Sequence, residues 1–502
     1  MLLGGLLMLV AVVVAMFFAI EESGGLSNYP YFFLLPWIVG LAIVLVTPSA
    51  ILFYKGKFTL SNPIVWATWT YLFPAFVMGG FFMAGGWSQP YYLSFIQDAE
   101  YTLPLTISLV ALGFIGLSIG YFLPLGSRVG GLLERMLPAT DYSTKAYYLP
   151  SFLLFVLGIF NTSFAFIMGL FGFQRAQEFG TYDGIVYLTT LFWVQGSFLL
   201  WSIVFRQEKL KPVHFLTIAF LIVTALGRSI FSGTRGGLVT ACFTVVLAYV
   251  LSGKAFRIRH YILAGCIFFS VLMAGMIYGS TFRAVKGSEE RQNIDQYAEN
   301  VLQTIDQVGQ SDVGGMFDYG FSRITERMDV VSGLAVVVSN HERLEPYEEA
   351  YGINDNIWTD LTTFFIPRVI WTDKPAASDA RRFSDLYFEF GESSTAITPF
   401  GDLLRNYGIP GVFVGMFALG LILRTLHRML IENQSPRLWR SALWFMVLMS
   451  VSFEGFYGTI IPFLFKDGVT AVIGISIVCL LAAKLMGGDR SEGALLKRPL
   501  LG

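Results

Sequence analysis

Apolar stretches of about twenty residues recur along most of this chain, and they constrain its fold more than any other feature. Backbone N–H and C=O groups in lipid must be paired within the protein, so segments of this kind cross a bilayer as helices. We count twelve candidate spans, at about residues 1–20, 31–53, 61–84, 101–123, 149–171, 185–205, 213–230, 236–252, 259–281, 409–427, 438–456 and 468–486. Only 14% of the residues are charged, where about 25% is usual in a soluble domain. The sequence therefore predicts an all-α polytopic membrane protein.

The positive charges are distributed unequally between alternate loops. One set of loops and ends holds 19 of the 34 Lys and Arg residues, and the short loops of the other set hold 4. Cytoplasmic loops of membrane proteins carry an excess of Lys and Arg. We therefore expect both termini to be cytoplasmic and the long segment 282–408 to lie outside.

This pattern divides the chain into three parts. Residues 1–281 form a bundle of about nine spans, 282–408 form one large external loop, and 409–502 form about three spans and a cytoplasmic tail. A loop of this length is expected to have structure of its own. Residues 296–310 and 321–340 have the apolar spacing of helices, and 359–371 has the pattern of a short interfacial or re-entrant helix that ends at Pro367.

Several motifs that would indicate a reaction class are absent from the sequence. It contains no Walker P-loop, no strand-borne GxGxxG, no HExxH, no Cys/His metal spacing and no DxD pair. These absences argue against an ATP-driven pump, a zinc protease and an enzyme that uses nucleotide sugars. We expect neither a metal nor another cofactor.

A set of cations lies in the predicted external loop or at its boundaries. Guanidinium groups bind phosphate oxygens with two parallel hydrogen bonds, so such a set suits a lipid-linked phosphate or pyrophosphate. The candidates are Arg235, Arg327, Arg368, Lys374, Arg381, Arg382 and Arg405. The alternative is that these cations pair with the acids of the same loop. Arg235, in SGTRGG, either snorkels to the interface or binds an anion near a helix N-terminus.

Four side chains are candidates for a general base. Asp402, Glu392 and His341 lie in the predicted external loop, and Glu454 lies at the predicted outer end of a span. A carboxylate or an imidazole can remove the proton of a sugar hydroxyl. Each also has a simpler interpretation, since His341 and Glu392 are equally suited to a solvated loop and Glu454 to an ion pair with an arginine such as Arg405. The sequence leaves the choice open.

Three runs of residues resemble a known family. FFIPRVIWTDKP, preceded by EPYEEAYG and followed by PFGDLLRNYGIPG, resembles the Pro-Arg…Lys-Pro block and the Asn-(Phe/Tyr)-Gly turn of the O-antigen polymerases, the Wzy-type oligosaccharide repeat-unit polymerases. SGTRGGLVTACFTVVLAYVL resembles a span start that this family shares with the O-antigen ligases. The pattern departs at one place, because Asp402 and Arg405 precede Asn406 where the family usually has Glu.

The resemblance implies a metal-independent, multi-span glycosyltransferase in the bacterial inner (cytoplasmic) membrane. Its reaction would join undecaprenyl-pyrophosphate-linked repeat units into an O-antigen, capsule or exopolysaccharide of the cell envelope at the outer, periplasmic face. Donor and acceptor would both be lipid-linked, with membrane lipid and a chain-length regulator as further partners. The seven cations would hold the donor pyrophosphate, and a carboxylate or His341 would deprotonate the acceptor hydroxyl. The alternatives are an O-antigen-type ligase and a flippase for lipid-linked oligosaccharide.

Overall fold

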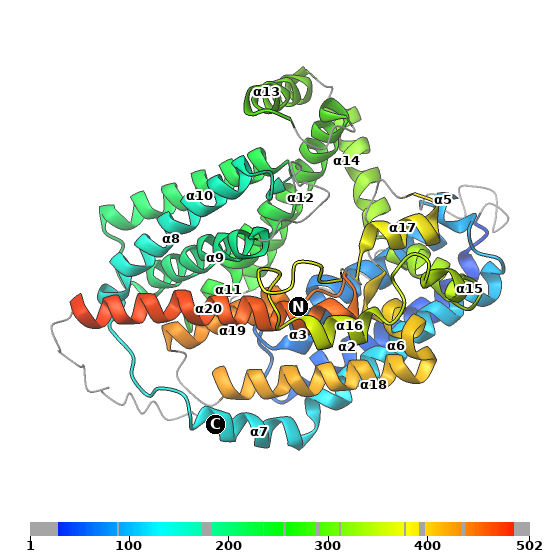
Figure 1. The fold of residues 1–502 in the computed structure, drawn as a ribbon, viewed down its shortest axis with the longest axis horizontal. Coiled ribbons are helices and arrows are strands. Elements are labelled where there is room, and N and C mark those ends of the chain that lie inside the picture. Colours follow the sequence, from blue (N-terminus) through cyan, green and yellow to red (C-terminus); the bar gives the residue numbers. More distant parts are fainter. Residues whose placement is uncertain are drawn as a thin grey trace.

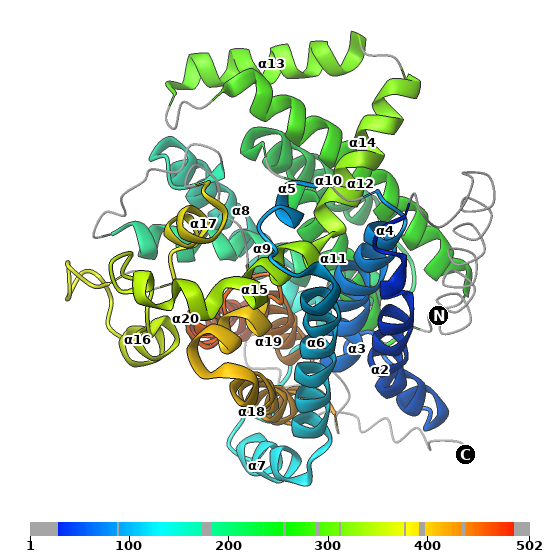
Figure 2. The same cartoon turned by 90° about the vertical axis from the view of Figure 1, so that its right-hand side faces the viewer.

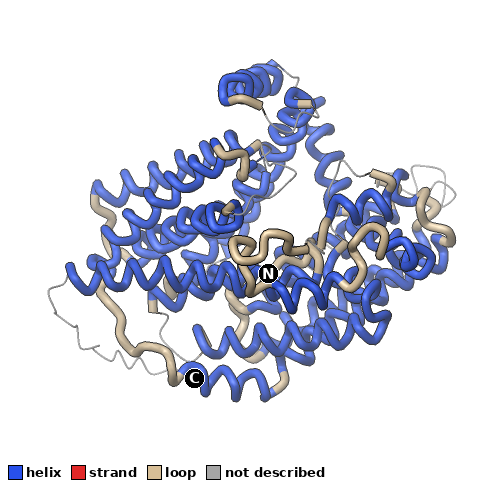
Figure 3. Tube along the Cα trace, viewed as in Figure 1, coloured by secondary structure: helices blue, strands red, loops and turns tan. Residues whose placement is uncertain are grey.

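The computed structural model describes residues 29–87, 90–172, 182–233, 235–254, 258–287, 292–310, 313–375, 378–390, 397–432 and 437–485. Within these ranges the regular elements are helices and no strand occurs (Figure 3). The predicted all-α class is therefore confirmed. The predicted first span, 1–20, and the end of the chain beyond residue 485 lie outside the described residues.

Nine helical segments of the described chain are long and apolar enough to cross a membrane. They are η2–α2 (Phe32–Leu34 and Leu35–Tyr54), α3–η3–α4 (Pro63–Ala67, Thr68–Met78 and Gly79–Ala84), α6 (Ala99–Phe122), α8 (Thr144–Ile167), α9 (Asp183–Arg206), α10 (Pro212–Ser232), α12 (Ile258–Lys286), α18 (Thr398–Leu430) and α20 (Tyr457–Leu485). Two shorter apolar helices, α11 (Arg235–Leu251) and α19 (Leu438–Ser450), coincide with further predicted spans. The chain is thus a polytopic membrane protein, and the total of twelve spans stays a prediction.

Two of the membrane helices begin earlier than the sequence pattern predicts. Helix α18 begins at Thr398 instead of near residue 409, and α20 begins at Tyr457 instead of near residue 468. The predicted turn is present as a break within α18 at Gly408. The φ of Gly408 is 65°, a conformation that glycine adopts without steric cost. The earlier starts place Asp402 and Lys466 on helices, where the sequence predicts loops.

Five helices lie between α12 and α18. They are α13 (Ile294–Gln310), α14 (Val313–Met328), α15 (Val330–Glu348), α16 (Asn356–Thr363) and α17 (Ala380–Phe388). The predicted helix 321–340 is wrong as a single element, because Asp329 caps α15 by accepting a hydrogen bond from the Ser332 N–H at 3.0 Å. The short helix predicted at 359–371 is present as α16 and ends before Pro367.

Helix α18 runs beside α6, and α7 (Pro124–Glu134) continues that contact (Figure 2). The two helices approach closely because α6 presents glycines to α18. A Cβ atom on Gly120 would lie 2.1 Å from the carbonyl oxygen of Phe417, so no larger residue fits there. Helix α18 is therefore held in place along most of its length.

The helices between α12 and α18 share a core with the membrane helices. One buried cluster includes Leu334 of α15, Phe383 of α17 and Phe400 of α18 together with residues of α2 and α6. A second cluster joins α8, α9, α11, α19 and α20. Figure 1 shows α15, α16 and α17 at the end of the molecule where α18 begins. This packing brings α16, the beginning of α18 and the beginning of α20 together.

Candidate functional site

A buried ion network, which we call the clamp, lies where α15, α16 and α18 meet. Its members are Glu348, Asn356, Asp402 and Arg405. The Arg405 side chain is 1% exposed and donates hydrogen bonds to Glu348 Oε2 at 2.8 Å and to Asp402 Oδ1 at 3.1 Å. It also donates to Asn356 Oδ1 at 2.6 Å and to the carbonyl oxygen of Ile353 at 2.9 Å. The guanidinium charge is thus compensated by two carboxylates of the chain itself.

Asp402 connects three helices within the clamp. Its Oδ1 atom accepts from Asn356 Nδ2 of α16 at 3.0 Å, and its Oδ2 atom accepts from the Gly458 N–H of α20 at 3.0 Å. The residue is fully buried. Since both of its oxygens are occupied, the geometry indicates that Asp402 positions α16 and α20 against α18.

The remaining carboxylate of the clamp is Glu348 at the end of α15. Burial raises the pKa of Glu348, and the positive charge of Arg405 opposes this effect. The Tyr387 hydroxyl of α17 donates to Glu348 Oε1 at 2.7 Å, which adds a fourth helix to the network. A buried charge without such partners would be strongly destabilising.

A second group of charged residues, the cationic cluster, lies next to the clamp. It consists of Asp360, Lys374, Lys466 and Arg368, all partly buried. The charges of both lysines act on Asp360, and the charge of Arg368 acts on both lysines. Burial, together with the positive charges of Lys466 and Arg368, lowers the pKa of Lys374 to about 8. Asp467, next to Lys466 on α20, adds a second carboxylate to the group. Three cations against two carboxylates still leave an excess of positive charge, which favours binding of an anion.

Asp360 has the electrostatic surroundings of a proton acceptor that works near neutral pH. Burial raises its pKa to about 6, while a hydrogen bond from the Ser378 hydroxyl lowers it and the nearby Asp402 charge raises it. The charges of Lys466 and Lys374 favour the ionised form. A carboxyl group with this pKa is mostly ionised at neutral pH and still accepts a proton readily.

The loop that follows α16 folds back over the end of that helix. Lys374 Nζ donates to the carbonyl oxygens of Thr363 at 2.7 Å and Ile366 at 3.1 Å, so this lysine also caps α16. The rings of Phe364 and Phe465 meet edge to face with centroids 5.0 Å apart, which fixes the loop against α20.

Large apolar side chains of this region remain exposed. Trp358, Phe365, Ile370 and Trp371 are all exposed, and they lie within a few residues of Asp360, Arg368 and Lys374 in the sequence. Aromatic rings of this kind suit both a membrane interface and the apolar face of a sugar. The residues that carry the cationic cluster are thus flanked along the chain by exposed apolar side chains.

The other predicted cations lie apart from this arrangement. Arg381 and Arg382 are exposed on α17, and Arg382 Nε lies 3.7 Å from Asp379 Oδ2, as the pairing alternative expects. Arg327 of α14 forms an ion pair with Glu454, in the connection between α19 and α20. Arg235 begins α11, and its side chain is not among those described.

The candidate bases are placed differently as well. Glu454 pairs with Arg327, where the sequence suggests a partner such as Arg405. His341 is partly buried on α15, with Nδ1 3.2 Å from the carbonyl oxygen of Val338 in its own helix. Glu392 lies outside the described residues. Of the three that the structure describes, Asp402 lies beside the cationic cluster, where its charge acts on Asp360.

Sequence reasoning missed Asp360 and Lys466 as members of the site. Asn356 and Asp360 are four residues apart on one helix, which places both on one face of α16. Lys466 and Asp467 interrupt an apolar run, and charges within a membrane helix are functional candidates by default. Both signals were present in the sequence, but the predicted span boundary put Lys466 in a loop.

Comparisons with models of protein families, with curated proteins and with solved structures find no match to this chain. Within the described residues, no group of three or more His, Cys, Asp and Glu side chains is arranged to hold a metal ion. The function is therefore argued from the site and from the sequence resemblance.

Proposed function

We propose that this chain is a glycosyltransferase that polymerises repeat units linked to a polyprenyl pyrophosphate, at the outer face of the bacterial inner membrane. The observation that carries the proposal is the cationic cluster, in which Lys374 and Lys466 act on Asp360 and Arg368 acts on both lysines. The resemblance of residues 364–375 to the O-antigen polymerases points to the same substrate.

Donor binding is the first task of the cluster. A pyrophosphate brings negative charge that the three cations stabilise, most strongly where the leaving oxygen gains charge in the transition state. Lys374 loses part of its affinity for a proton to burial and to neighbouring cations, so a bound anion relieves an unfavourable arrangement.

Proton removal is the second task, and we assign it to Asp360. The acceptor hydroxyl gives its proton to the Asp360 carboxylate while its oxygen forms a bond to the anomeric carbon of the donor. The bond from that carbon to the pyrophosphate oxygen breaks, and polyprenyl pyrophosphate leaves with the electron pair. Asp402 then has a positioning role, because its oxygens are already paired within the clamp.

The proposal includes a membrane topology for the chain. It puts both termini in the cytoplasm, the helices between α12 and α18 outside, and twelve spans in the membrane. The excess of Lys and Arg in the opposite set of loops supports this orientation. The beginnings of α18 and α20 then lie at the outer face, beside α16.

A ligase is the second candidate, because the SGTRGG start of α11 resembles a segment that polymerases and ligases share. One assay separates the candidates: the purified chain in lipid nanodiscs receives lipid-linked repeat units and no other acceptor. A ladder of longer glycans on the lipid carrier is the expected result. Transfer only after a second acceptor is added would identify a ligase, and transport of the lipid-linked unit across vesicles without growth would identify a flippase.

A further inference from the structure

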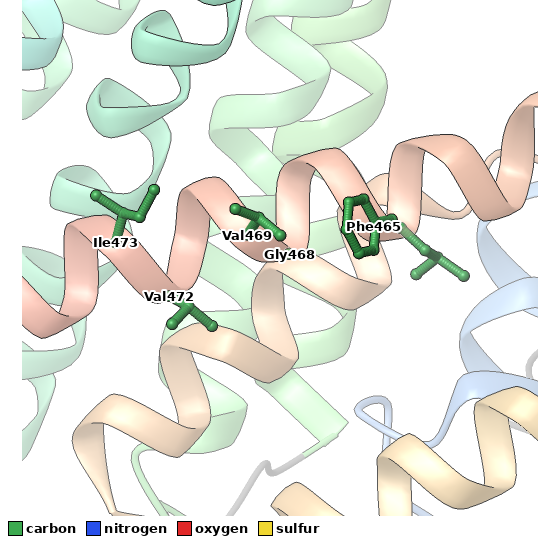
Figure 4. Close-up of a pocket in the computed structure, with 6 residues that line it drawn as sticks. Phe465, Gly468, Val469, Val472 and Ile473 are labelled. Atoms are coloured by element: carbon green, nitrogen blue, oxygen red, sulfur yellow. The ribbon is translucent and has the colours of Figure 1, made fainter. Parts of the chain in front are cut away.

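Away from the candidate site, one hollow of about 340 Å³ lies on the surface of α20, and its lining is apolar. Figure 4 shows the labelled lining residues along successive turns of this one helix. Exposed apolar side chains of a membrane span are covered by the lipid of the bilayer, so this hollow needs no ligand of its own. A group of charged side chains at the far end of α18 is different, because lipid chains cannot compensate its charge.

Four arginines gather where α7, the end of α18 and the beginning of α19 meet (Figure 1). We call them the arginine group, and its members are Arg424, Arg428, Arg437 and Arg440. Arg428 Nη1 lies 2.5 Å from Glu134 Oε2 of α7. Arg424 Nη2 lies 2.9 Å from Glu432 Oε2. Four guanidinium groups thus meet two carboxylates, which leaves an excess of positive charge.

Arg440 is the buried member of the group. Its side chain is 2% exposed, and its Nη1 atom lies 3.5 Å from the carbonyl oxygen of Met429 and 3.6 Å from Glu134 Oε1. Both distances are at or beyond the limit of a hydrogen bond. The Nε atom of Arg440 is buried and has no hydrogen-bond partner among the described residues. Because a buried charge with incomplete pairing is costly, a further negative charge beside Arg440 would be stabilising.

The surroundings of the arginine group do not remove its excess charge. The carbonyl groups at the end of α18 carry a partial negative charge and the N–H groups at the beginning of α19 a comparable positive one, so these two helix ends offset each other. Asp141 is the next acid along the chain after Glu134. Its Oδ1 atom accepts a hydrogen bond from the Tyr147 hydroxyl at 2.9 Å, so it is already engaged in α8.

The arginine group lies at the level where a membrane span ends. Arg424 directly follows the apolar run 409–423 of α18. Cations at such positions reach the phosphates of lipid headgroups. Arg437 is partly exposed, and its Nη1 atom donates to the carbonyl oxygen of Pro138 at 2.9 Å. Within the described residues this leaves the Nε and Nη2 groups of Arg437 for a ligand.

Helix α7 places an apolar surface beside these charges. It packs closely on the end of α18, because a Cβ atom on Gly130 would lie only 2.5 Å from the carbonyl oxygen of Thr425. Its other side carries Leu125, Val129 and Leu132, which are exposed and spaced as one face of a helix. An acyl chain can lie on this stripe while the phosphate of the same lipid reaches the arginine group.

We propose that the arginine group binds a phosphate group whose charge is not neutralised within its own molecule. Arg437 would donate hydrogen bonds to the phosphate oxygens, and Arg440 would add its charge from the buried side. The headgroup of an anionic phospholipid and a free phosphorylated solute both offer this chemistry, and the stripe on α7 favours the phospholipid. The site lies at the opposite end of α18 from the clamp, so the inference does not depend on the proposed glycosyl transfer.

The test measures the thermal unfolding midpoint of the full chain in a neutral detergent while phosphatidylglycerol, phosphatidylcholine or inorganic phosphate is added. We expect phosphatidylglycerol to raise the midpoint until the site is saturated. Phosphatidylcholine, whose headgroup has no net charge, should have a much smaller effect. In Arg437→Gln, the phosphatidylglycerol concentration that gives half of the shift should rise about fivefold, the loss expected for one cation beside a headgroup phosphate.

Two further variants make the result specific. Lys209→Gln removes an exposed cation from the connection between α9 and α10, which the loop charges place on the same side of the membrane, and should behave as the unchanged chain. Arg437→Lys keeps the charge and should restore most of the binding, which separates the loss of a cation from a folding defect. An equal shift with inorganic phosphate, with the same dependence on Arg437, would support the site and assign it to a free solute. Equal responses to the two lipids, or an unchanged half-concentration in Arg437→Gln, would overturn the inference.

Discussion

The clamp and the cationic cluster lie side by side and both combine cations with carboxylates, but they differ in how their charges are paired. In the clamp one guanidinium faces two carboxylates, and the Arg405 side chain is 1% exposed. In the cationic cluster three cations meet the carboxylates of Asp360 and Asp467, and all remain partly accessible. A charge that is compensated within the chain holds helices together, whereas an uncompensated and accessible one can hold a ligand.

The difference between the clamp and the cationic cluster predicts that substitution of Asp360 causes the largest loss of activity. Asp360→Asn keeps an acceptor for Ser378 but removes the base, so activity should fall about 100- to 10,000-fold while the protein still inserts and folds. Glycan growth from lipid-linked repeat units measures the loss. Asp373→Asn, an exposed carboxylate of the same loop, is the control and should be active. Wild-type activity in Asp360→Asn would transfer the base role to another carboxylate.

Substitution of a clamp residue should lower the stability of the folded protein. Arg405→Ala leaves Glu348 and Asp402 buried without their cation, which typically costs about 3–5 kcal/mol. The thermal unfolding midpoint and the monodisperse fraction in detergent report this loss. Arg343→Ala, an exposed arginine of α15, serves as the control. If Arg405→Ala were as stable as the control but inactive, Arg405 would belong to the ligand site instead.

Substitution of Arg368 should lower activity and leave stability unchanged, in contrast to Arg405→Ala. Arg368→Ala removes a phosphate partner, so kcat/KM should fall by an amount equivalent to about 2–5 kcal/mol. Its unfolding midpoint should match that of Arg343→Ala, because Arg368 is not a member of the clamp. Near-normal polymer from Arg368→Ala would overturn the assignment of the cationic cluster to the donor.

The smallest expected effect is on how activity depends on pH. Activity should fall below a pH of about 6, where Asp360 gains a proton, and above about 8, where Lys374 loses one. Arginine keeps its charge above that range. Lys374→Arg should therefore reduce activity only a few-fold at neutral pH and extend the profile to higher pH. An alkaline limb that stays near 8 in this variant would show that Lys374 does not produce it.

Much of the architecture was predictable from the sequence. Apolar runs fixed the helical class and most span positions, because lipid allows few other conformations to an isolated segment. The sequence also singled out the Pro-Arg…Lys-Pro block, in which the charge of Arg368 acts on Lys374, and its role as the site stays a prediction. The beginnings of α18 and α20 were not predicted, since polar residues such as Asp402 and Lys466 lower the local hydropathy although tertiary partners surround them.

The sequence by itself determined that this chain crosses a membrane repeatedly as helices, and that a cationic, aromatic segment precedes one of the last spans. Hydrophobicity and helix-breaking residues act locally, so both features can be read without a fold. Only the tertiary structure decided which charges compensate one another. Arg405 meets Glu348 and Asp402, while Lys374 and Lys466 act on Asp360 and Arg368 acts on both lysines, because α16 packs against α18 and α20. Pairing depends on distances between residues far apart in the chain, and those distances come from packing alone.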